Sequence, residues 1–386
     1  MERERIYLDY ASTTPTDERV REAMEPYWSD VFANANALHS MGQESKRALE
    51  TARQQIAGFL NARSEEIICT SGGTESNSLA IFGVLDALGE LAGKHIITSA
   101  IEHPSVLDCF RRLEEKGARV SIVPVDALGV LDMKAFEEVL SPETVLVSIM
   151  MVNNEIGTVQ PIAEIGNMLA AYAKKHGTKK AAFHTDASQA PVYLNVDVDL
   201  LHVDLLTLDA QKMYGPKGVG ALYVRNGVSI SPIFWGGKQE RGIRPGTENV
   251  PGIVGMAQAF AIIEEERAAE YVRVKALQEL FLTRIAETIP SALVNGSLEH
   301  RLPNNVNISF PGKEAQFVVL QLDAAGIMAS TKSTCFGDDG EGSPVVRALA
   351  EDSSRANSAV RFTFGRFTTE ADIERVVEVL ARLVQG

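Results

Sequence analysis

The sequence predicts an α/β protein in which a mainly parallel, seven-stranded sheet is covered by helices and followed by a smaller α+β domain. Short apolar runs alternate with helical stretches for about 180 residues, which is typical of chains that build parallel sheets. Several of these runs are apolar on both faces, as strands covered by helices on each side should be. Beyond residue 250 the alternation is replaced by one long helical region and a mixed tail.

The expected elements follow in order along the chain. After a short N-terminal segment, residues 44–62 have the apolar period of a helix. The seven expected strands lie within residues 66–70, 95–100, 118–125, 144–152, 180–187, 203–210 and 220–224. Residues 251–289 form the long helical region, and the tail contains 304–310, 315–327, 359–367 and a terminal helix within 368–385. We therefore expect a large domain over 16–255 and a small domain over 1–15 and 256–386.

The composition excludes several classes of function. The 386 residues include 37 Lys and Arg against 51 Asp and Glu, a formal net charge of −14, which disfavours binding to nucleic acid and anionic lipid. No apolar run approaches the ~20 residues of a membrane span, and the charged start has no apolar signal segment, so we expect a cytoplasmic protein. The cysteines Cys69, Cys109 and Cys335 lie far apart, a pattern that supports neither a metal site nor a disulfide framework.

Polar residues that follow the expected strands are the first candidates for a site, because ligands collect at the carboxyl ends of strands in such sheets. The strand 66–70 runs into Gly72, Gly73 and Thr74 at the start of a helical stretch, which is typical of a phosphate site, although an ordinary turn has the same pattern. Asp186 and Gln189 follow the strand 180–187. A buried carboxylate needs a cationic partner such as a protonated pyridine, but a helix N-cap is the alternative.

His103 and Lys212 follow two further strands. A lone histidine is usually structural, and only its position favours a function. Lys212 closes the strand 203–210, whereas Lys217 lies in a Gly-Pro-Lys-Gly turn that should hold its side chain in solvent. A lysine near a carboxylate, an anion-binding loop and a stacking ring is the set that holds pyridoxal phosphate as a Schiff base.

At this point the sequence resembles the cysteine desulfurases, fold-type I pyridoxal-phosphate enzymes of the class V aminotransferase group. The resemblance runs from YLDYASTTP to VRFTFGRFTTEADI. It includes TSGGTES, EHPSVL, VNNEIGTVQP, HTDASQ, KMYGPKGVGALYV, RPGTENVPGIVGM and STKSTC. The resemblance implies a fold-type I transferase that converts L-cysteine to L-alanine.

The resemblance also implies a role for each candidate residue. Lys212 would be the Schiff-base lysine and His103 the stacking and proton-moving residue. Contacts to the cofactor would come from Gly73, Thr74, Asp186, Gln189, Gln211 and, from the second subunit of a homodimer, Thr247. Asn154 and Arg361 would hold the substrate carboxylate, which suits a guanidinium. Cys335 would be the nucleophile that becomes a persulfide and passes sulfur to an acceptor such as an iron-sulfur scaffold or a tRNA-thiolation protein.

Cys335 also has support from its own surroundings in the sequence. It precedes the acidic, glycine-rich stretch FGDDGEGSP, a composition that favours an exposed thiol on a bendable loop. Cys69 and Cys109 instead occupy positions typical of a core strand and a helix face.

The chain departs from the family pattern next to Lys212. Asp209-Ala210-Gln211-Lys212 replaces the usual Ser-x-His-Lys, whose Ser and His contact the cofactor phosphate. Asp209 at ~4 Å from a phosphate would be repelled by roughly 1 to 4 kcal/mol, so either it turns away or it weakens cofactor binding. Ala33 and Ala35 replace a glycine and a proline, and Lys332 replaces a glycine.

Three functions remain open at this level. The first is a cysteine desulfurase for iron-sulfur assembly or tRNA thiolation. The second is another enzyme of the same group, a selenocysteine lyase or an aminotransferase, and transamination would not require Cys335. The third is a desulfurase-like scaffold with weakened cofactor binding. The sequence does not identify the sulfur acceptor or the preference between cysteine and selenocysteine.

Overall fold

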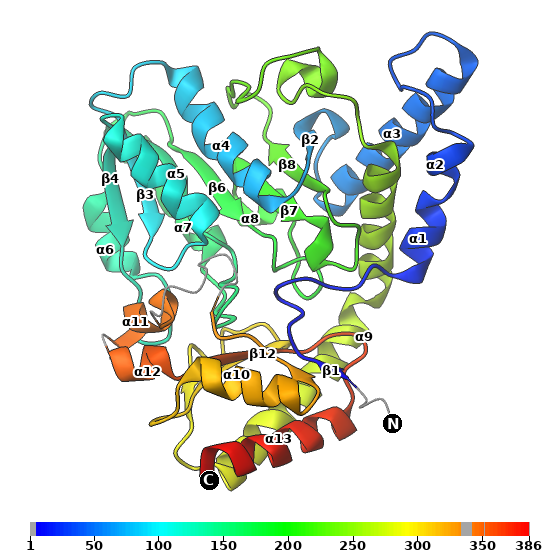
Figure 1. Ribbon diagram of the computed structural model, residues 1–386. Helices are drawn as coiled ribbons and strands as arrows, with labels where there is room; N and C mark the ends of the chain where they lie inside the picture. The colour runs from blue at the N-terminus through cyan, green and yellow to red at the C-terminus, as the bar shows by residue number, and fades with distance from the viewer. Residues whose placement is uncertain (1–4, 333–341, 351, 386) are drawn as a thin grey trace.

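A computed structural model of the chain describes residues 5–332, 342–350 and 352–385. Its main feature is a seven-stranded sheet in the order β2-β8-β7-β6-β5-β3-β4 (Figure 1). The strands are β2 (Ile67–Thr70), β3 (His95–Ser99), β4 (Arg119–Val123), β5 (Thr144–Ser148), β6 (Ala182–Asp186), β7 (Leu205–Asp209) and β8 (Gly220–Val224). All seven lie within the predicted ranges. Only β8 pairs antiparallel to its neighbours β2 and β7, so the prediction of a mainly parallel sheet is confirmed.

Neighbouring residues of each strand point into different cores, which explains why the strands are apolar throughout. Ile96 packs in one hydrophobic cluster and Ile97 in the other, and Leu205 and Leu206 divide in the same way. This follows from the two-residue alternation of side chains along a strand. The edge strand β4 is the exception, with Ile122 exposed.

Helices cover both faces of this sheet. One face packs against α4 (Gly73–Leu88) and α5 (Pro104–Glu115), which share a cluster with Ile96 and Leu205. The other face packs against α3 (Ser40–Phe59), α6 (Met133–Val139), α7 (Ile162–His176) and part of α9 (Val250–Thr288). Shorter helices are α1 (Glu18–Met24), α2 (Pro26–Ser29), α8 (Val198–Leu201) and the 3₁₀ turns η1 (Ser64–Glu66), η2 (Ala210–Lys212) and η3 (Gln239–Gly242).

Helix α9 joins the large sheet region to the smaller one, as predicted for residues 251–289 (Figure 1). Near its start, the ring of Phe260 lies 4.3 Å from that of Phe59 on α3. Further along, Phe281 lies 5.2 Å and 5.6 Å from the rings of Phe362 and Phe364 in the C-terminal part of the chain. A single helix therefore contributes to both hydrophobic regions.

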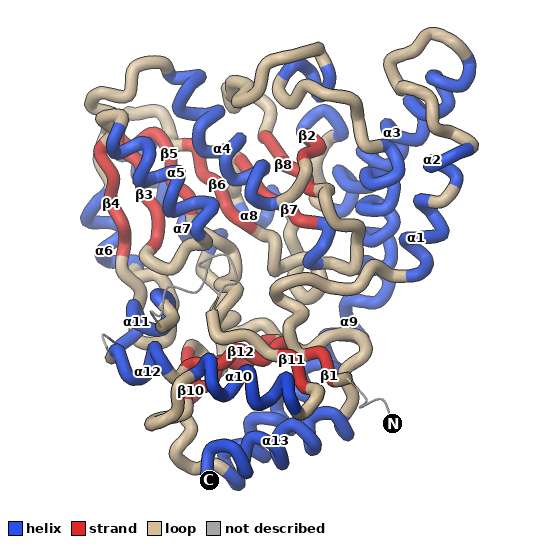
Figure 2. Tube along the Cα trace, viewed as in Figure 1, coloured by secondary structure: helices blue, strands red, loops and turns tan. Residues whose placement is uncertain are grey.

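The C-terminal part of the chain is a smaller α+β unit, drawn below the large sheet in Figure 2. The strand β10 (Asn305–Ser309) pairs antiparallel with β12 (Ala359–Thr363) and β9 (Leu293–Asn295). The strand β1 (Ile6–Tyr7) pairs with β11 (Ile327–Met328), so the N-terminal segment joins this unit. Its helices are α10 (Ala315–Ala324), α11 (Pro344–Ala350), α12 (Ser353–Asn357) and α13 (Glu370–Gln385). The proposed domain limits, 16–255 against 1–15 and 256–386, stay a prediction.

Candidate active site

The predicted site residues converge on one pocket beyond the carboxyl ends of β6 and β7. Its walls come from the large sheet region, the N-terminal segment and β12. The pocket is lined by Ala11, Ser12, Gly73, Thr74, Asn77, His103, Ser105, Met150, Val152, Asn154, Asp186, Ser188, Gln189, Asp209, Gln211, Lys212 and Arg361. Nine of the predicted site residues are in this set, so strand ends distant in sequence do meet at one place.

Lys212 is the last residue of η2, and its side chain is held by the N-terminal segment. Its Nζ donates to the carbonyl oxygen of Ala11 at 2.9 Å and to that of Ser12. Lys217, by contrast, is exposed in its turn, as predicted, and its Nζ donates to the Thr14 carbonyl at 2.9 Å. Of the two lysines, Lys212 is the one that lines the pocket.

Asp186 is fixed in place by two donors. Its Oδ1 accepts from the Ser188 N–H at 2.9 Å and its Oδ2 accepts from Asn77 Nδ2 at 2.7 Å. No helix follows β6 directly, so Asp186 is not a helix N-cap. A carboxylate offers about four lone-pair sites, and these two bonds leave acceptor capacity for a cationic ligand.

His103 is connected to Asp186 through a short relay on α4 and α5. Asn77 also donates to Ser105 Oγ at 2.9 Å, and Ser105 Oγ lies 2.8 Å from His103 Nδ1. His103 caps the N-terminus of α5, where its Nδ1 accepts the Ser105 backbone N–H at 3.1 Å. A ring nitrogen that accepts this bond carries no proton, so the neutral imidazole bears its proton on Nε2.

A second acid lies beside His103. Glu102 is fully buried, and this burial raises the pKa of its carboxyl to about 8 despite hydrogen bonds from Ser99 Oγ and the Met150 N–H. Glu102 does not line the pocket, so we assign it a structural role in supporting the segment that carries His103.

The start of α4 closes the opposite end of the pocket. The tight approach of Gly72 to Gly220 leaves no room for side chains, since a Cβ on Gly220 would lie 2.7 Å from the Gly72 Cα. At Gly73 an added Cβ would meet Ser188 Oγ at 3.0 Å. Glycines therefore let the first N–H groups of the helix face the pocket, which is the arrangement that binds phosphate groups.

Asp209 lines this same end of the pocket and has not turned away. Its carboxylate accepts from the Gln211 N–H at 3.3 Å and from Gln211 Nε2 at 3.1 Å. Burial raises the pKa of the Asp209 carboxyl, while Gln211, Lys212 and the Gly73 N–H act in the opposite direction. The predicted conflict between Asp209 and a phosphate thus has a structural basis.

Arg361 forms the third wall. It is 1% exposed, and its Nη2 donates to Asp9 Oδ1 at 2.7 Å and to Ser12 Oγ at 2.6 Å. Its Nη1 donates to the carbonyl of Asn154 at 3.0 Å. Within the described part of the chain its buried Nε has no hydrogen-bond partner. Gln189, which also lines the pocket, donates through Nε2 to the Ala11 carbonyl at 2.9 Å.

Of the remaining two predicted residues, one lies away from this pocket and the other is not among the described residues. Thr247 is exposed in the segment before α9, and it does not line the pocket of its own chain. Cys335 lies outside the described residues. The other two cysteines are buried, Cys69 on β2 and Cys109 on α5, as predicted from their sequence positions.

The pocket suits pyridoxal phosphate at most of its contacts. Lys212 supplies an amine, Asp186 keeps free acceptor capacity, and the α4 N-terminus supplies N–H donors. The buried Asn77 Oδ1 has no partner among the described residues and offers a further acceptor at the wall. Asp209 is the residue that opposes the group.

Sequence reasoning missed Asn77, Ser105, Asp9 and the Ala11 and Ser12 carbonyls. The one signal in the sequence was Asn77, a polar residue within helix α4, which contains the stretch SLAIFGVL and is otherwise rich in apolar residues.

Comparisons with known proteins agree with this geometry. Residues 6–376 match the family described as aminotransferase class-V. The chain is 43% identical over 385 residues to a cysteine desulfurase IscS from Dictyoglomus turgidum, with 100% of this chain and 95% of that protein covered. The chain belongs to the cysteine desulfurase family. The resemblance and the fold-type I architecture predicted from the sequence are both confirmed.

Solved structures also superpose closely on the chain. A NifS-like protein matches with a TM-score of 0.92 at 34% identity, covering 99% of this chain and 100% of that one. SspA in complex with cysteine matches with a TM-score of 0.81 at 36% identity, covering 94% of this chain and 100% of that one. Over the described residues, no helix has the length and apolar content needed to cross a membrane.

Proposed function

We propose that the protein is a pyridoxal-phosphate-dependent cysteine desulfurase that converts L-cysteine to L-alanine and transfers the sulfur to its own Cys335. The observation that carries the proposal is the convergence of Lys212, Asp186, His103 and Arg361 on one pocket. A pocket with an amine, a fixed carboxylate, a histidine and a buried guanidinium suits a cationic ring and an amino-acid carboxylate together.

In this proposal each residue at the ring end has one task. Lys212 anchors the cofactor through its amine, and Asp186 balances the charge of the protonated ring nitrogen. Gln189 would bind the ring hydroxyl, and His103 would stack on the ring. When bound, the cofactor supplies an electron sink for the bonds around the amino acid Cα. The relay through Asn77 and Ser105 keeps the His103 proton on Nε2, which is the nitrogen left to give or take a proton.

At the substrate end, Arg361 and Asn154 bind the carboxylate of cysteine. Asp9 is a positioning residue, because its bond to Nη2 fixes the plane of the guanidinium. An arginine held in this way loses little side-chain freedom when it takes up a carboxylate. The same bond partly neutralises Arg361, so the substrate competes with Asp9 for its charge.

At the phosphate end, the N–H groups of Gly73 and Thr74 and the Gln211 amide are the donors. We further propose a homodimer in which the partner subunit's Thr247 adds a contact to the phosphate. An exposed Thr247 that lies away from its own pocket is compatible with that role. We also assign the protein to the cytoplasm, with an iron-sulfur scaffold or a tRNA-thiolation protein as the sulfur acceptor.

The test is direct. Protein loaded with pyridoxal phosphate is incubated with L-cysteine and a reductant, and sulfide and alanine are measured. Equal amounts of both products are expected from the wild type and almost none from Cys335→Ser, which should still bind the cofactor. Sulfide release at the wild-type rate from Cys335→Ser would contradict the assignment of the nucleophile. Formation of pyruvate or keto acid in place of alanine would favour another enzyme of the group.

A further inference from the structure

The phosphate end of the pocket contains a carboxylate that the proposed function does not use. Asp209 is 6% exposed, and its Oδ2 lies 3.4 Å from the position that a Cβ on Gly73 would occupy. The carboxylate therefore lies over the first residue of α4, at the helix N-terminus where a phosphate would bind. The Gly73 N–H already acts on this carboxylate and stabilises its charged form.

Asp209 has little freedom to leave this position. It is the last residue of β7 and pairs with Gly220 on β8. Its side chain also caps η2 through the Gln211 N–H, and the Gln211 amide holds the other oxygen. Rotation away from the pocket would break both bonds and would leave a nearly buried carboxylate without donors.

The charged groups around Asp209 do not offset a second anion. Lys212, on η2, is the cation that acts on it, and in the proposed function Lys212 is used by the cofactor. On α4, Glu75 is another carboxylate, and it is already paired with Arg244 at 2.8 Å. On β6, Asp186 is held by Asn77 and Ser188, and β8 contributes only Gly220.

We propose that Asp209 takes up one proton from solvent when a phosphate ester binds at the start of α4, and that the resulting carboxylic acid donates a hydrogen bond to the phosphate. This inference rests on the proposed function, because pyridoxal phosphate supplies the ester. A protonated carboxyl has one O–H donor, so protonation converts the opposing group into a phosphate ligand. Ser at this position in the family pattern is also a hydroxyl donor.

Burial and a nearby anion act in the same direction on this acid. Burial already raises the pKa of the Asp209 carboxyl, and a phosphate dianion against the same N–H groups raises it further. An ionised Asp209 would weaken cofactor binding by about 5-fold to about 1,000-fold, for charges ~4 Å apart across plausible dielectrics. Proton uptake avoids this loss without moving the strand.

The test counts protons. Pyridoxal phosphate is titrated calorimetrically into cofactor-free protein at about pH 8 in two buffers of different ionisation enthalpy, since the phosphate is then a dianion. Asp209→Asn carries a permanent donor in place of the acid and is expected to take up about one proton fewer than the wild type. Correspondingly, log Kd for pyridoxal phosphate should rise more steeply with pH for the wild type than for Asp209→Asn, with slopes that differ by about one log unit per pH unit.

Two controls isolate the phosphate and the residue. Asp204→Asn changes a buried aspartate that immediately precedes the same strand, beyond the end opposite Asp209, and this variant should take up as many protons as the wild type. Pyridoxal, which lacks the phosphate, should show no difference between the wild type and Asp209→Asn. If Asp209→Asn does not fold, Asp209→Ser replaces it with the same expected proton count.

The outcomes separate this inference from the proposed function. Equal proton uptake by the wild type and Asp209→Asn, or an equal difference with pyridoxal, would overturn the role of Asp209 while the visible band of the lysine-bound cofactor still forms. If the wild type gives no visible band with either ligand, the proposed function fails, and this inference fails with it.

Discussion

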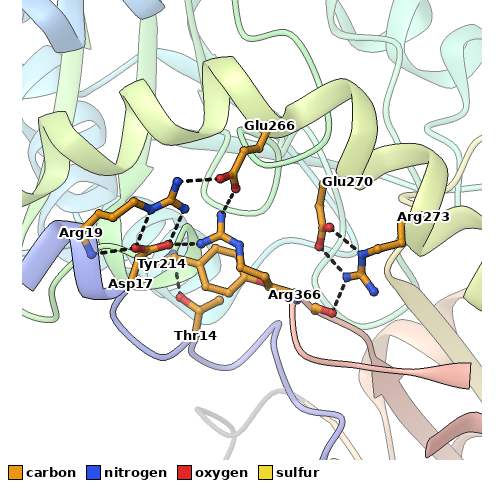
Figure 3. A network of polar contacts seen from close by, with 9 residues as sticks. Thr14, Asp17, Arg19, Tyr214, Glu266, Glu270, Arg273 and Arg366 are labelled. Carbon is orange, nitrogen blue, oxygen red and sulfur yellow. Dashed lines mark hydrogen bonds and ion pairs between the residues drawn. The ribbon is translucent and has the colours of Figure 1, made fainter. Parts of the chain in front are cut away.

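Replacing Arg366 with methionine should destabilise the protein more than the same change at Arg19, although both arginines bind the same two acids. Arg366 pairs with Asp17 and with Glu266 at 2.7 Å, and its guanidinium lies 4.4 Å from the centre of the Tyr214 ring (Figure 3). Arg19 pairs with the same acids, at 2.9 Å and 2.7 Å. The two differ in burial, since the side chains of Arg366 and Arg19 are 19% and 46% exposed.

The magnitude follows from what each change leaves behind. Arg366→Met keeps the apolar stem but removes two charge-assisted bonds and the ring contact. Such a contact contributes about 0.5 to 2 kcal/mol. Because Asp17 and Glu266 keep Arg19, neither acid is left unpaired, and we expect a loss of about 2 to 3 kcal/mol rather than the ~3 to 5 kcal/mol of an orphaned buried charge. Arg19→Met removes two ion pairs of a half-exposed side chain and should cost about 0.5 to 1 kcal/mol.

The assay is urea unfolding of cofactor-free protein, followed by fluorescence and circular dichroism at about pH 7. The network joins the N-terminal segment, α9 and the C-terminal segment, so Arg366→Met should also broaden the transition or divide it into two. The explanation would be refuted if the two variants lost equal stability within about 0.5 kcal/mol. Equal losses would mean that burial and the Tyr214 contact contribute nothing.

The loss of unfolding free energy in Arg366→Met should also depend on pH. The hydrogen bond from Arg19 is the largest influence on Asp17 and lowers the pKa of its carboxyl, with Arg366 adding to the effect. A depressed folded pKa gives stability that is present above the unfolded value, near 3.8, and is lost as the pH falls through the folded value. The difference between wild type and variant should therefore be constant from about pH 7 to about pH 5 and narrow in more acid solution.

Three further predictions concern the site. Lys212→Ala should abolish the visible band of bound pyridoxal phosphate, while Lys217→Ala should keep it. An unchanged spectrum for Lys212→Ala would contradict the assignment of Lys212 as the residue that binds the cofactor. Arg361→Lys should raise KM for cysteine about 10-fold to 100-fold, because a charged hydrogen bond contributes ~1.5 to 3 kcal/mol, and it should leave the band intact. After a cysteine pulse, mass spectrometry should find extra sulfur on Cys335 and none on Cys69, whose thiol has its pKa raised to about 12 by burial. Persulfide on Cys69 would count against this mechanism.

The fold could be predicted because apolar strands covered on both faces leave a continuous signal. The segment 95–100 was expected as a strand and β3 occupies His95–Ser99. The reversed direction of β8 was not predicted, since strand direction depends on the connection and on pairing partners. The strands β1, β9 and β11 have two or three residues each, too few to show a period.

The site residues also divide into those that the sequence predicted and those that it did not. Lys212, Asp186 and His103 were predicted because each lies at the end of an apolar strand or within a few residues after it, so local sequence indicates its place. Asn77 was missed because its role depends on a contact with Asp186, 109 residues away in sequence. Asp9 was missed for the same reason, since its partner is 352 residues away. Contacts of this kind follow from how elements pack, and a single sequence does not state them.

The N-terminal segment connects the two ends of the pocket. Ala11 and Ser12 give their carbonyls to Lys212, and the same Ser12 accepts from Arg361 through its hydroxyl. Carbonyl acceptors suit an ammonium group, whereas the anchoring reaction needs a neutral amine. If Lys212 binds the cofactor through its amine, as we propose, its nitrogen loses N–H donors, and its contacts to a segment that also contacts Arg361 should loosen. Because this segment is secured by the pairing of β1 with β11, we expect the reactivity of the lysine to depend on the small unit as well as on the large sheet.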